Sequence, residues 1–180
     1  MDAAATTRPE GKGPSGEVRP LARIDLPRVA ELRWKALGER THLDSRFLLA
    51  PDLHDRLPTV LSIWAEQEDR VTLVVTEGRG DDHDPLVGYA TGIVSVWPPV
   101  WRAQRVGEVA EVYVLPEARG RGHGRLLLEG LLDALSSLGV DVLRAPVPKR
   151  QEASLRLFRA LGFTPVLRVL ERAVPPPGEL

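Results

Sequence analysis

The pattern of apolar and polar positions is clearest in the middle of the chain, over residues 108–138. Residues 109–115 are mostly β-branched or aromatic and end at Pro116, which predicts a strand because proline cannot donate to a sheet. From residue 126 leucines recur at helical spacing up to Gly139, where a glycine would end the helix. Six residues, Arg-Gly-Arg-Gly-His-Gly, connect the two over 119–124. The pattern therefore predicts a strand, a glycine turn and a helix.

The same periodicities divide the rest of the chain. They predict strands at 17–24, 71–76, 86–97, 140–147 and 166–174, and helices at 26–37, 52–68 and 149–161. Residues 78–85 read as the turn of a hairpin between two of these strands. Residues 1–16 lack any period and are expected to be a disordered extension, while three consecutive prolines begin a tail at 175–180. We expect one α/β (α+β) domain over 17–174.

Composition narrows the function classes. A chain of 180 residues with 43% apolar residues suits a single core, and a net charge of −1 argues against general affinity for nucleic acid or anionic membranes. No apolar run approaches the ~18 residues of a membrane span, and no hydrophobic signal core opens the chain, so a cytoplasmic location is expected. With no cysteine, acyl transfer must use another nucleophile or pass directly between substrates. Residues 81–84 (Asp-Asp-His-Asp) read as a solvated turn, so no metal site is predicted.

The glycine turn has the features of an anion site. Glycines let a ligand approach the main chain, and the first amides of a helix have no internal partner. Arg119, Arg121 and Arg125 add charges that suit phosphate, although a solvated arginine cluster is the other interpretation. Neither nucleotide motif fits: no Lys-Ser or Lys-Thr follows the glycines, and the sixth position of a dinucleotide fingerprint is Arg125 rather than glycine.

Two segments resemble a known family. The strand ending Val114-Leu115-Pro116, followed by Arg119-x-x-Gly-x-Gly, resembles the acetyl-CoA-binding motif of the GNAT N-acetyltransferase superfamily. Residues 151–163 resemble its second signature, with Gln151, Ser154 and Phe158 at the matching positions. The resemblance implies a central, mixed, mostly antiparallel twisted sheet of about six to seven strands flanked by about four helices. It also implies acetyl-CoA as cosubstrate, a small-molecule or peptide amine as acceptor, and a homodimer as one assembly.

The resemblance also implies roles for individual residues. Amides of the turn would hold the CoA pyrophosphate, and amides near Val114 and Leu115, beside Tyr113, would hold the thioester carbonyl. The turn positions are Arg119, Gly120, Arg121, Gly122, His123, Gly124 and Arg125. His123 is interpreted as a residue that fills the loop, with a catalytic histidine as the alternative.

The second signature departs from the family at two positions. Phe158 stands where the family usually has a tyrosine that can protonate the CoA thiolate, and phenylalanine has no proton to give. Gln151 replaces an asparagine and keeps an amide with a longer reach. Because CoA thiol is itself acidic, the missing tyrosine does not exclude activity.

Acetyl transfer to an amine needs a base, because an alkyl ammonium of pKa about 10.4 costs roughly 4–5 kcal/mol to deprotonate at pH 7. Glu108 and Glu111 are the candidates on the central strand. Their odd spacing puts them on opposite faces of a regular strand, whereas a bulge would break that parity. We favour Glu108 slightly; a solvated or salt-bridged glutamate is the alternative for each.

The sequence leaves the function and the acceptor open. An acyl-CoA-binding module without catalysis and another nucleotide-binding α/β enzyme are rival functions, and the acceptor is not identified. The region between the first two strands often lines the acceptor site in the family, and its aromatic residues could do so or simply pack: Trp34, Phe47, His54 and Trp64. The Trp-Pro-Pro-Val-Trp loop at 97–101 could cover the cleft, contact a second subunit or pack.

Overall fold

The computed structural model describes residues 16–43, 48–78, 84–149 and 151–170. One five-stranded sheet with strand order β1-β2-β3-β4-β5 forms its centre. The strands are β1 (Val18–Pro20), β2 (Arg70–Thr76), β3 (Leu86–Val96), β4 (Arg105–Val114) and β5 (Val142–Arg144). All neighbours are antiparallel except β4 and β5, which are parallel. The mixed, mostly antiparallel α/β sheet is therefore confirmed, with fewer strands than expected.

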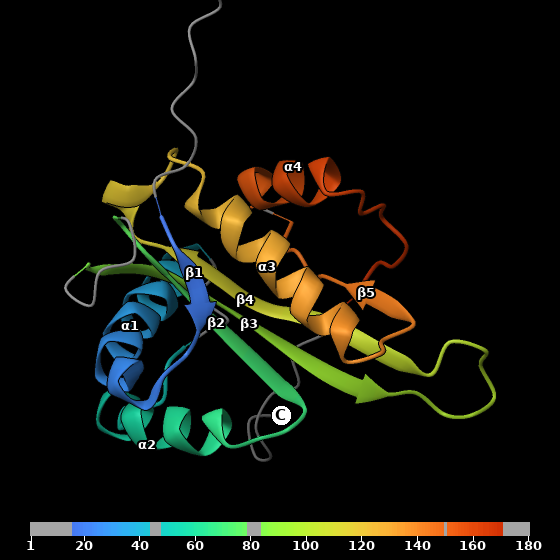
Figure 1. Ribbon diagram of the computed structural model, residues 1–180, viewed down its shortest axis with the longest axis horizontal. Coiled ribbons are helices and arrows are strands. Elements are labelled where there is room, and N and C mark those ends of the chain that lie inside the picture. The colour runs from blue at the N-terminus through green and yellow to red at the C-terminus, as the bar shows by residue number, and fades with distance from the viewer. Residues whose placement is uncertain (1–15, 44–47, 79–83, 150, 171–180) are drawn as a thin grey trace, which may run out of the picture.

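Helices cover both faces of the sheet (Figure 1). They are α1 (Leu26–Leu43), α2 (Leu53–Ala65), α3 (His123–Ser137) and α4 (Glu152–Ala160), with short 3-10 turns η1 (Arg23–Asp25) and η2 (Pro116–Ala118). Helices α1 and α2 lie on one face, and α3 crosses the other with α4 beside it. The four helices found over the described ranges agree with the number expected.

The core lies on both faces of the sheet, and α3 covers one of them. The leucines that predicted this helix are its buried face, since Leu127, Leu128, Leu131 and Leu135 are at most 1% exposed. Gly92 on β3 lets the helix come close, because a Cβ there would lie 2.9 Å from a Leu135 methyl carbon. The helical period read from the sequence thus fixed which side of α3 meets the sheet.

The predicted C-terminal strand is wrong over residues 166–170, which form no strand. Val166 and Leu170 are 84% and 86% exposed, because no neighbouring strand pairs with this segment in the part of the chain that is described. Residues 171–174, the extension 1–15, the tail 175–180 and turn residues 79–83 lie outside the described residues. Phe47 and Arg150 also lie outside them.

The loop between β3 and β4 extends beyond the body of the sheet (Figure 1). Val100 and Trp101 are 78% and 61% exposed, so simple packing of this loop is wrong for these side chains. Among the described residues, no helix is long and apolar enough to cross a membrane.

Candidate active site

The two glutamates of β4 lie on the same face of the sheet because the strand contains a bulge. Thr91 of β3 pairs with Glu111 and the next residue, Gly92, pairs with Val109, which leaves Ala110 as an extra residue. Cross-strand partners share a face, and Gly92 faces α3, so both glutamates point toward α1 and α2. Of the two geometries left open by the sequence, the structure has the bulged one.

The strand β4 has an open edge next to these glutamates. Its parallel pairing with β5 runs only from Val106 to Glu108. The Leu115 amide donates to the Val87 carbonyl of β3 at 2.8 Å, so the prediction of a free amide at Leu115 is wrong. Because antiparallel hydrogen bonding alternates, the Val114 amide points to the opposite, open edge. The Val114 carbonyl on that edge accepts a 2.8 Å hydrogen bond from Arg119 Nε.

The open edge leads directly into the glycine turn. Gly120 and Gly122 have φ of +77° and +90°, values that only glycine adopts easily, and α3 begins one residue later. The amides of Arg125 and Leu126 both donate to the Gly122 carbonyl. Within the described chain, no backbone acceptor binds the amides of residues 120–122 or of Gly124. The turn thus presents a run of donors at the positive end of a helix dipole.

The three arginines of the turn are paired with carboxylates. Arg119 donates to both oxygens of Glu39 at 3.0 and 2.8 Å, Arg121 pairs with Glu77, and Arg125 pairs with Glu129 at 2.8 Å. These arginine side chains are 47–57% exposed, and ion pairs this exposed contribute about 0–1 kcal/mol each. The pairs are therefore weak enough for a phosphate to compete with them.

Two predicted residues are held in the interior. His123 is 1% exposed and its Nδ1 lies 3.0 Å from the Ala118 carbonyl; since a carbonyl only accepts, Nδ1 carries the proton. This agrees with a loop-filling residue. Phe158 is 8% exposed and packs edge-on against Phe163 at 5.2 Å, so its ring offers little surface to a ligand.

The other residues of the second signature, Gln151 and Ser154, lie at the start of α4, beside the glycine turn. Gln151 is the N-cap of α4, and both it and Ser154 are half-buried. Helix α4 packs beside the turn, since a Cβ at Gly124 would lie 3.9 Å from a Leu157 methyl carbon. This position keeps Gln151 and Ser154 as candidates for contacts along the pantetheine arm.

The glutamates differ in access. Glu108 Oε2 accepts from Arg144 Nε at 2.9 Å, and its side chain is 27% exposed. Glu111 is 14% exposed, and its Oε2 lies 3.1 Å from an Arg33 nitrogen; the same oxygen is buried and accepts no hydrogen bond of good geometry from any described group. A substrate amine can thus reach Glu108 more easily than Glu111.

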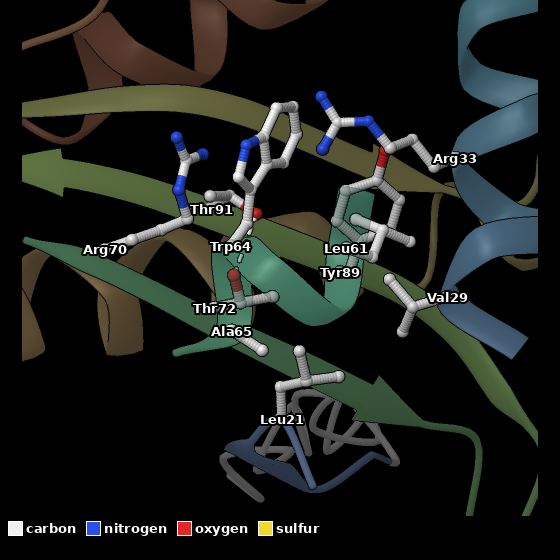
Figure 2. Close-up of a pocket in the computed structure, with 10 residues that line it drawn as sticks. All are labelled: Leu21, Val29, Arg33, Leu61, Trp64, Ala65, Arg70, Thr72, Tyr89 and Thr91. Carbon is white, nitrogen blue, oxygen red and sulfur yellow. Dashed lines mark hydrogen bonds between the residues drawn. The ribbon is translucent and has the colours of Figure 1, made fainter. Parts of the chain in front are cut away.

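No motif in the sequence marks Arg33 or Arg70 as a site residue. Figure 2 shows their guanidinium groups on either side of the Trp64 indole, with carbon-to-centroid distances of 4.5 and 4.4 Å. The Tyr89 hydroxyl points toward Arg33 in this view. Burial raises the pKa of Tyr89 well above its ordinary value, and Glu111 raises it further. No sequence signal links these residues, because they come from α1, α2, β2 and β3.

A shallow groove of about 390 Å³ lies at the other end of β4. It runs between α1 and the segment after β4, with Lys35, Glu39 and His42 on one side and Tyr113 on the other. The Tyr113 hydroxyl donates to Glu39 at 2.9 Å, and burial together with this bond raises the pKa of Tyr113 to about 12. Tyr113 and Arg119 therefore hold the same carboxylate beside the glycine turn.

An open strand edge that runs into a glycine turn and a helix N-terminus is the arrangement expected of an acetyltransferase fold. The family model "Acetyltransferase (GNAT) family" matches residues 28–163, and the chain belongs to this family. Acetyltransferases of this family use acetyl-CoA.

Curated relatives agree with the family assignment. The L-methionine sulfoximine/L-methionine sulfone acetyltransferase of Salmonella typhimurium is 43% identical over 53 residues, which are 29% of this chain and 31% of the relative. The phosphinothricin N-acetyltransferase of Streptomyces coelicolor is 30% identical over 147 residues, which are 82% of this chain and 81% of the relative. The chain thus matches about a third of the first relative's length and about four fifths of the second's.

Solved structures agree in fold. The aminoglycoside N-acetyltransferase AAC(6')-Iy in complex with CoA superposes with a TM-score of 0.68 at 15% identity and covers 93% of this chain and 99% of its own. The BH1408 protein from Bacillus halodurans, as a tetramutant, gives a TM-score of 0.74 at 18% identity, with 88% and 99% of the two chains covered. At these identities the likeness establishes the fold, and with the family match it confirms the recognition made from the two motifs.

Proposed function

We propose that the protein is an acetyl-CoA-dependent N-acetyltransferase that moves acetyl directly to a primary amine. The observation that carries the proposal is the open edge of β4, which leads from Glu108 past the Val114 amide into the glycine turn. Family membership supports the reaction class. The names of the two curated relatives refer to small molecules, which supports a small-molecule acceptor over a protein lysine.

The cosubstrate would be held mainly by main-chain donors. The amides of residues 120–122 and Gly124 would bind the pyrophosphate, which gains from the dipole of α3. The arginines of the turn would exchange part of their ion pairing for phosphate. The Val114 amide would bind the thioester oxygen, where negative charge grows during the reaction.

We assign the base to Glu108. It lies on the last rung that β4 shares with β5, where the two strands begin to separate, and it is the more exposed glutamate. Glu108 takes a proton from the ammonium group, and the neutral nitrogen then attacks the thioester carbon. The new C–N bond forms, the C–S bond breaks, and the nitrogen loses its second proton to solvent. CoA leaves as a thiolate that takes a proton from solvent, and Glu108 then releases its proton to solvent. Phe158 supplies no proton in this scheme.

The decisive experiment follows thiol release from acetyl-CoA with a panel of small amines. Glu108→Gln should lower kcat by about 10²–10⁴-fold, the usual contribution of a general base. Glu111→Gln should instead lower stability by about 3 kcal/mol, because it leaves Arg33 half-buried without its partner. Glu66→Gln, an exposed glutamate paired with Arg23, is the matched control and should change neither. A kcat unchanged by Glu108→Gln would contradict the assignment of the base.

The buried, hydroxyl-free Phe158 favours one rival, a module that binds acyl-CoA without catalysis. Calorimetry separates the two functions: CoA binding with no turnover on any amine would support the module. Absence of CoA binding at low salt would refute both.

A further inference from the structure

Only one arginine of the pair around Trp64 has a carboxylate within ion-pair distance among the described residues. Glu111 pairs with Arg33, whereas Arg70 has its Nε bonded to the neutral Gln67 side chain at 3.1 Å. No carboxylate of the described residues lies within ion-pair distance of Arg70. One carboxylate thus contacts this half-buried pair directly, through Arg33, and Asp69 acts on Arg70 from a longer distance.

The two guanidinium charges partly repel each other. Burial lowers the pKa of Arg70, the charge of Arg33 lowers it further, and the charge of Asp69 raises it. A guanidinium stays charged, so part of this repulsion remains. An anion between the two arginines would relieve it and could accept several charge-assisted hydrogen bonds.

The sheet places this charge near the proposed base. Arg70 of β2 pairs with Ile93 of β3, and Ile93 pairs with Glu108 of β4, so the three residues form one row on one face. Neighbouring strands lie about 4.8 Å apart, which puts the backbones at Arg70 and Glu108 about 10 Å apart. Both side chains are long, so a ligand only a few atoms in length can contact both.

The cavity beneath the pair is too small for that ligand. Its volume is about 10 Å³, the room of a single water, and it is lined by Tyr89, Thr72 and Thr91 (Figure 2). The Thr72 and Thr91 hydroxyls bond each other at 3.2 Å and close its floor. An anion would therefore contact the guanidinium groups from their outer side, where Arg70 and Trp64 are half-buried.

From this geometry we infer that the acceptor is a primary amine that carries its own acid group, as an α-amino acid does. The carboxylate binds Arg70 and Arg33 while the amine faces Glu108. This inference rests on the proposed acetyl transfer and specifies its acceptor. It makes Arg70 a specificity-determining residue, since the negative group of the substrate and not its amine contacts this side chain.

The test compares acceptors that differ only in the acid group. Thiol release is measured with L-methionine, L-glutamate and L-phenylalanine, each against its α-amide, and with ethanolamine, spermidine and kanamycin. Amidation lowers the basicity of the amine, which by itself would favour the amide, so a preference for the acid reports binding of the carboxylate. The wild type should prefer at least one free amino acid over its amide by about tenfold or more in kcat/KM.

Variants of Arg70 test whether this side chain causes the preference for the acid over the amide. Arg70→Gln should reduce the acid-to-amide ratio about tenfold, mainly through KM for the acid. Arg70→Lys keeps a charge without the planar fork and should keep part of the ratio. Arg23→Gln, an arginine 87% exposed and paired with Glu66 just beyond α2, is the matched control and should keep the full ratio. Melting temperatures show whether each variant is folded, and the wild-type comparison needs no variant.

The outcomes separate this inference from the proposed function. Transfer to ethanolamine, spermidine or kanamycin with no preference for acids would overturn the inference and leave the N-acetyltransferase intact. An acid preference unchanged in both Arg70 variants would also overturn it, because the acid would then bind elsewhere. No transfer to any amine would refute the proposed function itself.

Discussion

Replacing one glycine of the turn by alanine tests whether the turn binds the cosubstrate. Gly120 and Gly139 flank α3 at its two ends, have φ of +77° and +71°, and would both place a new Cβ in open space. Alanine at either position is strained by about 1–2 kcal/mol, because L-residues avoid this backbone conformation. For a chain of this size we expect both variants to melt about 2–8 °C lower.

Of the two glycines, only Gly120 lies in the turn whose amides have no backbone acceptor among the described residues. If the turn at Gly120→Ala relaxes to relieve its strain, at least one amide turns away from the phosphate. A hydrogen bond to a charged group is worth roughly 1.5–3 kcal/mol, so the dissociation constant for CoA should rise about 10- to 100-fold. Gly139→Ala should bind CoA as the wild type does.

Isothermal titration calorimetry with CoA at low salt, together with thermal unfolding, measures both quantities. Equal melting temperatures with different affinities would support the turn as the pyrophosphate site. If Gly120→Ala lost stability but bound CoA as tightly as Gly139→Ala, the reasoning would be refuted, because the turn would then not contact the ligand.

Three further predictions concern stability and assembly. Asp25 is 6% exposed, and its hydrogen bonds with Arg19 are the main cause of its lowered pKa, so its contribution to stability is present above about pH 4 and is lost as the pH falls through the lower folded value. Asp25→Asn should cost about 3 kcal/mol at pH 7 and make the stability measured by urea titration depend less on pH in the acid range; an unchanged pH dependence would contradict this. The Tyr113 pKa of about 12 favours the neutral phenol in the folded state, so stability should fall between pH 10 and 12 in the wild type and less in Tyr113→Phe. If the stability of both proteins fell equally with pH, the bond to Glu39 would contribute nothing. The exposed Trp101 leads us to expect a homodimer through the β3–β4 loop, which light scattering should detect and Trp101→Ser should weaken; a monomeric wild type would end this proposal.

Local sequence patterns predicted much of the fold and the glycine turn that we propose as the cosubstrate site. The leucine period of α3 gave its buried face, and the run from Val114 to Gly124 gave a strand, a turn and a helix start, because each depends on neighbours in the chain. Positive φ at Gly120 and Gly122 follows from the same local chemistry. The strand expected at 166–170 was wrong because strand formation needs a partner, which a local pattern cannot supply.

The tertiary structure alone decided how the face of the sheet around Glu108 is built. The bulge at Ala110 arises from the register between β3 and β4, and it brings Glu108 and Glu111 to one face despite their odd spacing. Sheet pairing also removed the Leu115 amide from the candidate donors. The cationic stack joins side chains from three separate elements around Trp64, and such contacts depend on how helices pack on the sheet. The sequence by itself therefore determined where the glycine turn lies, because that turn is local, whereas the placement of Glu108 and of the arginine pair depends on contacts between residues far apart in the chain.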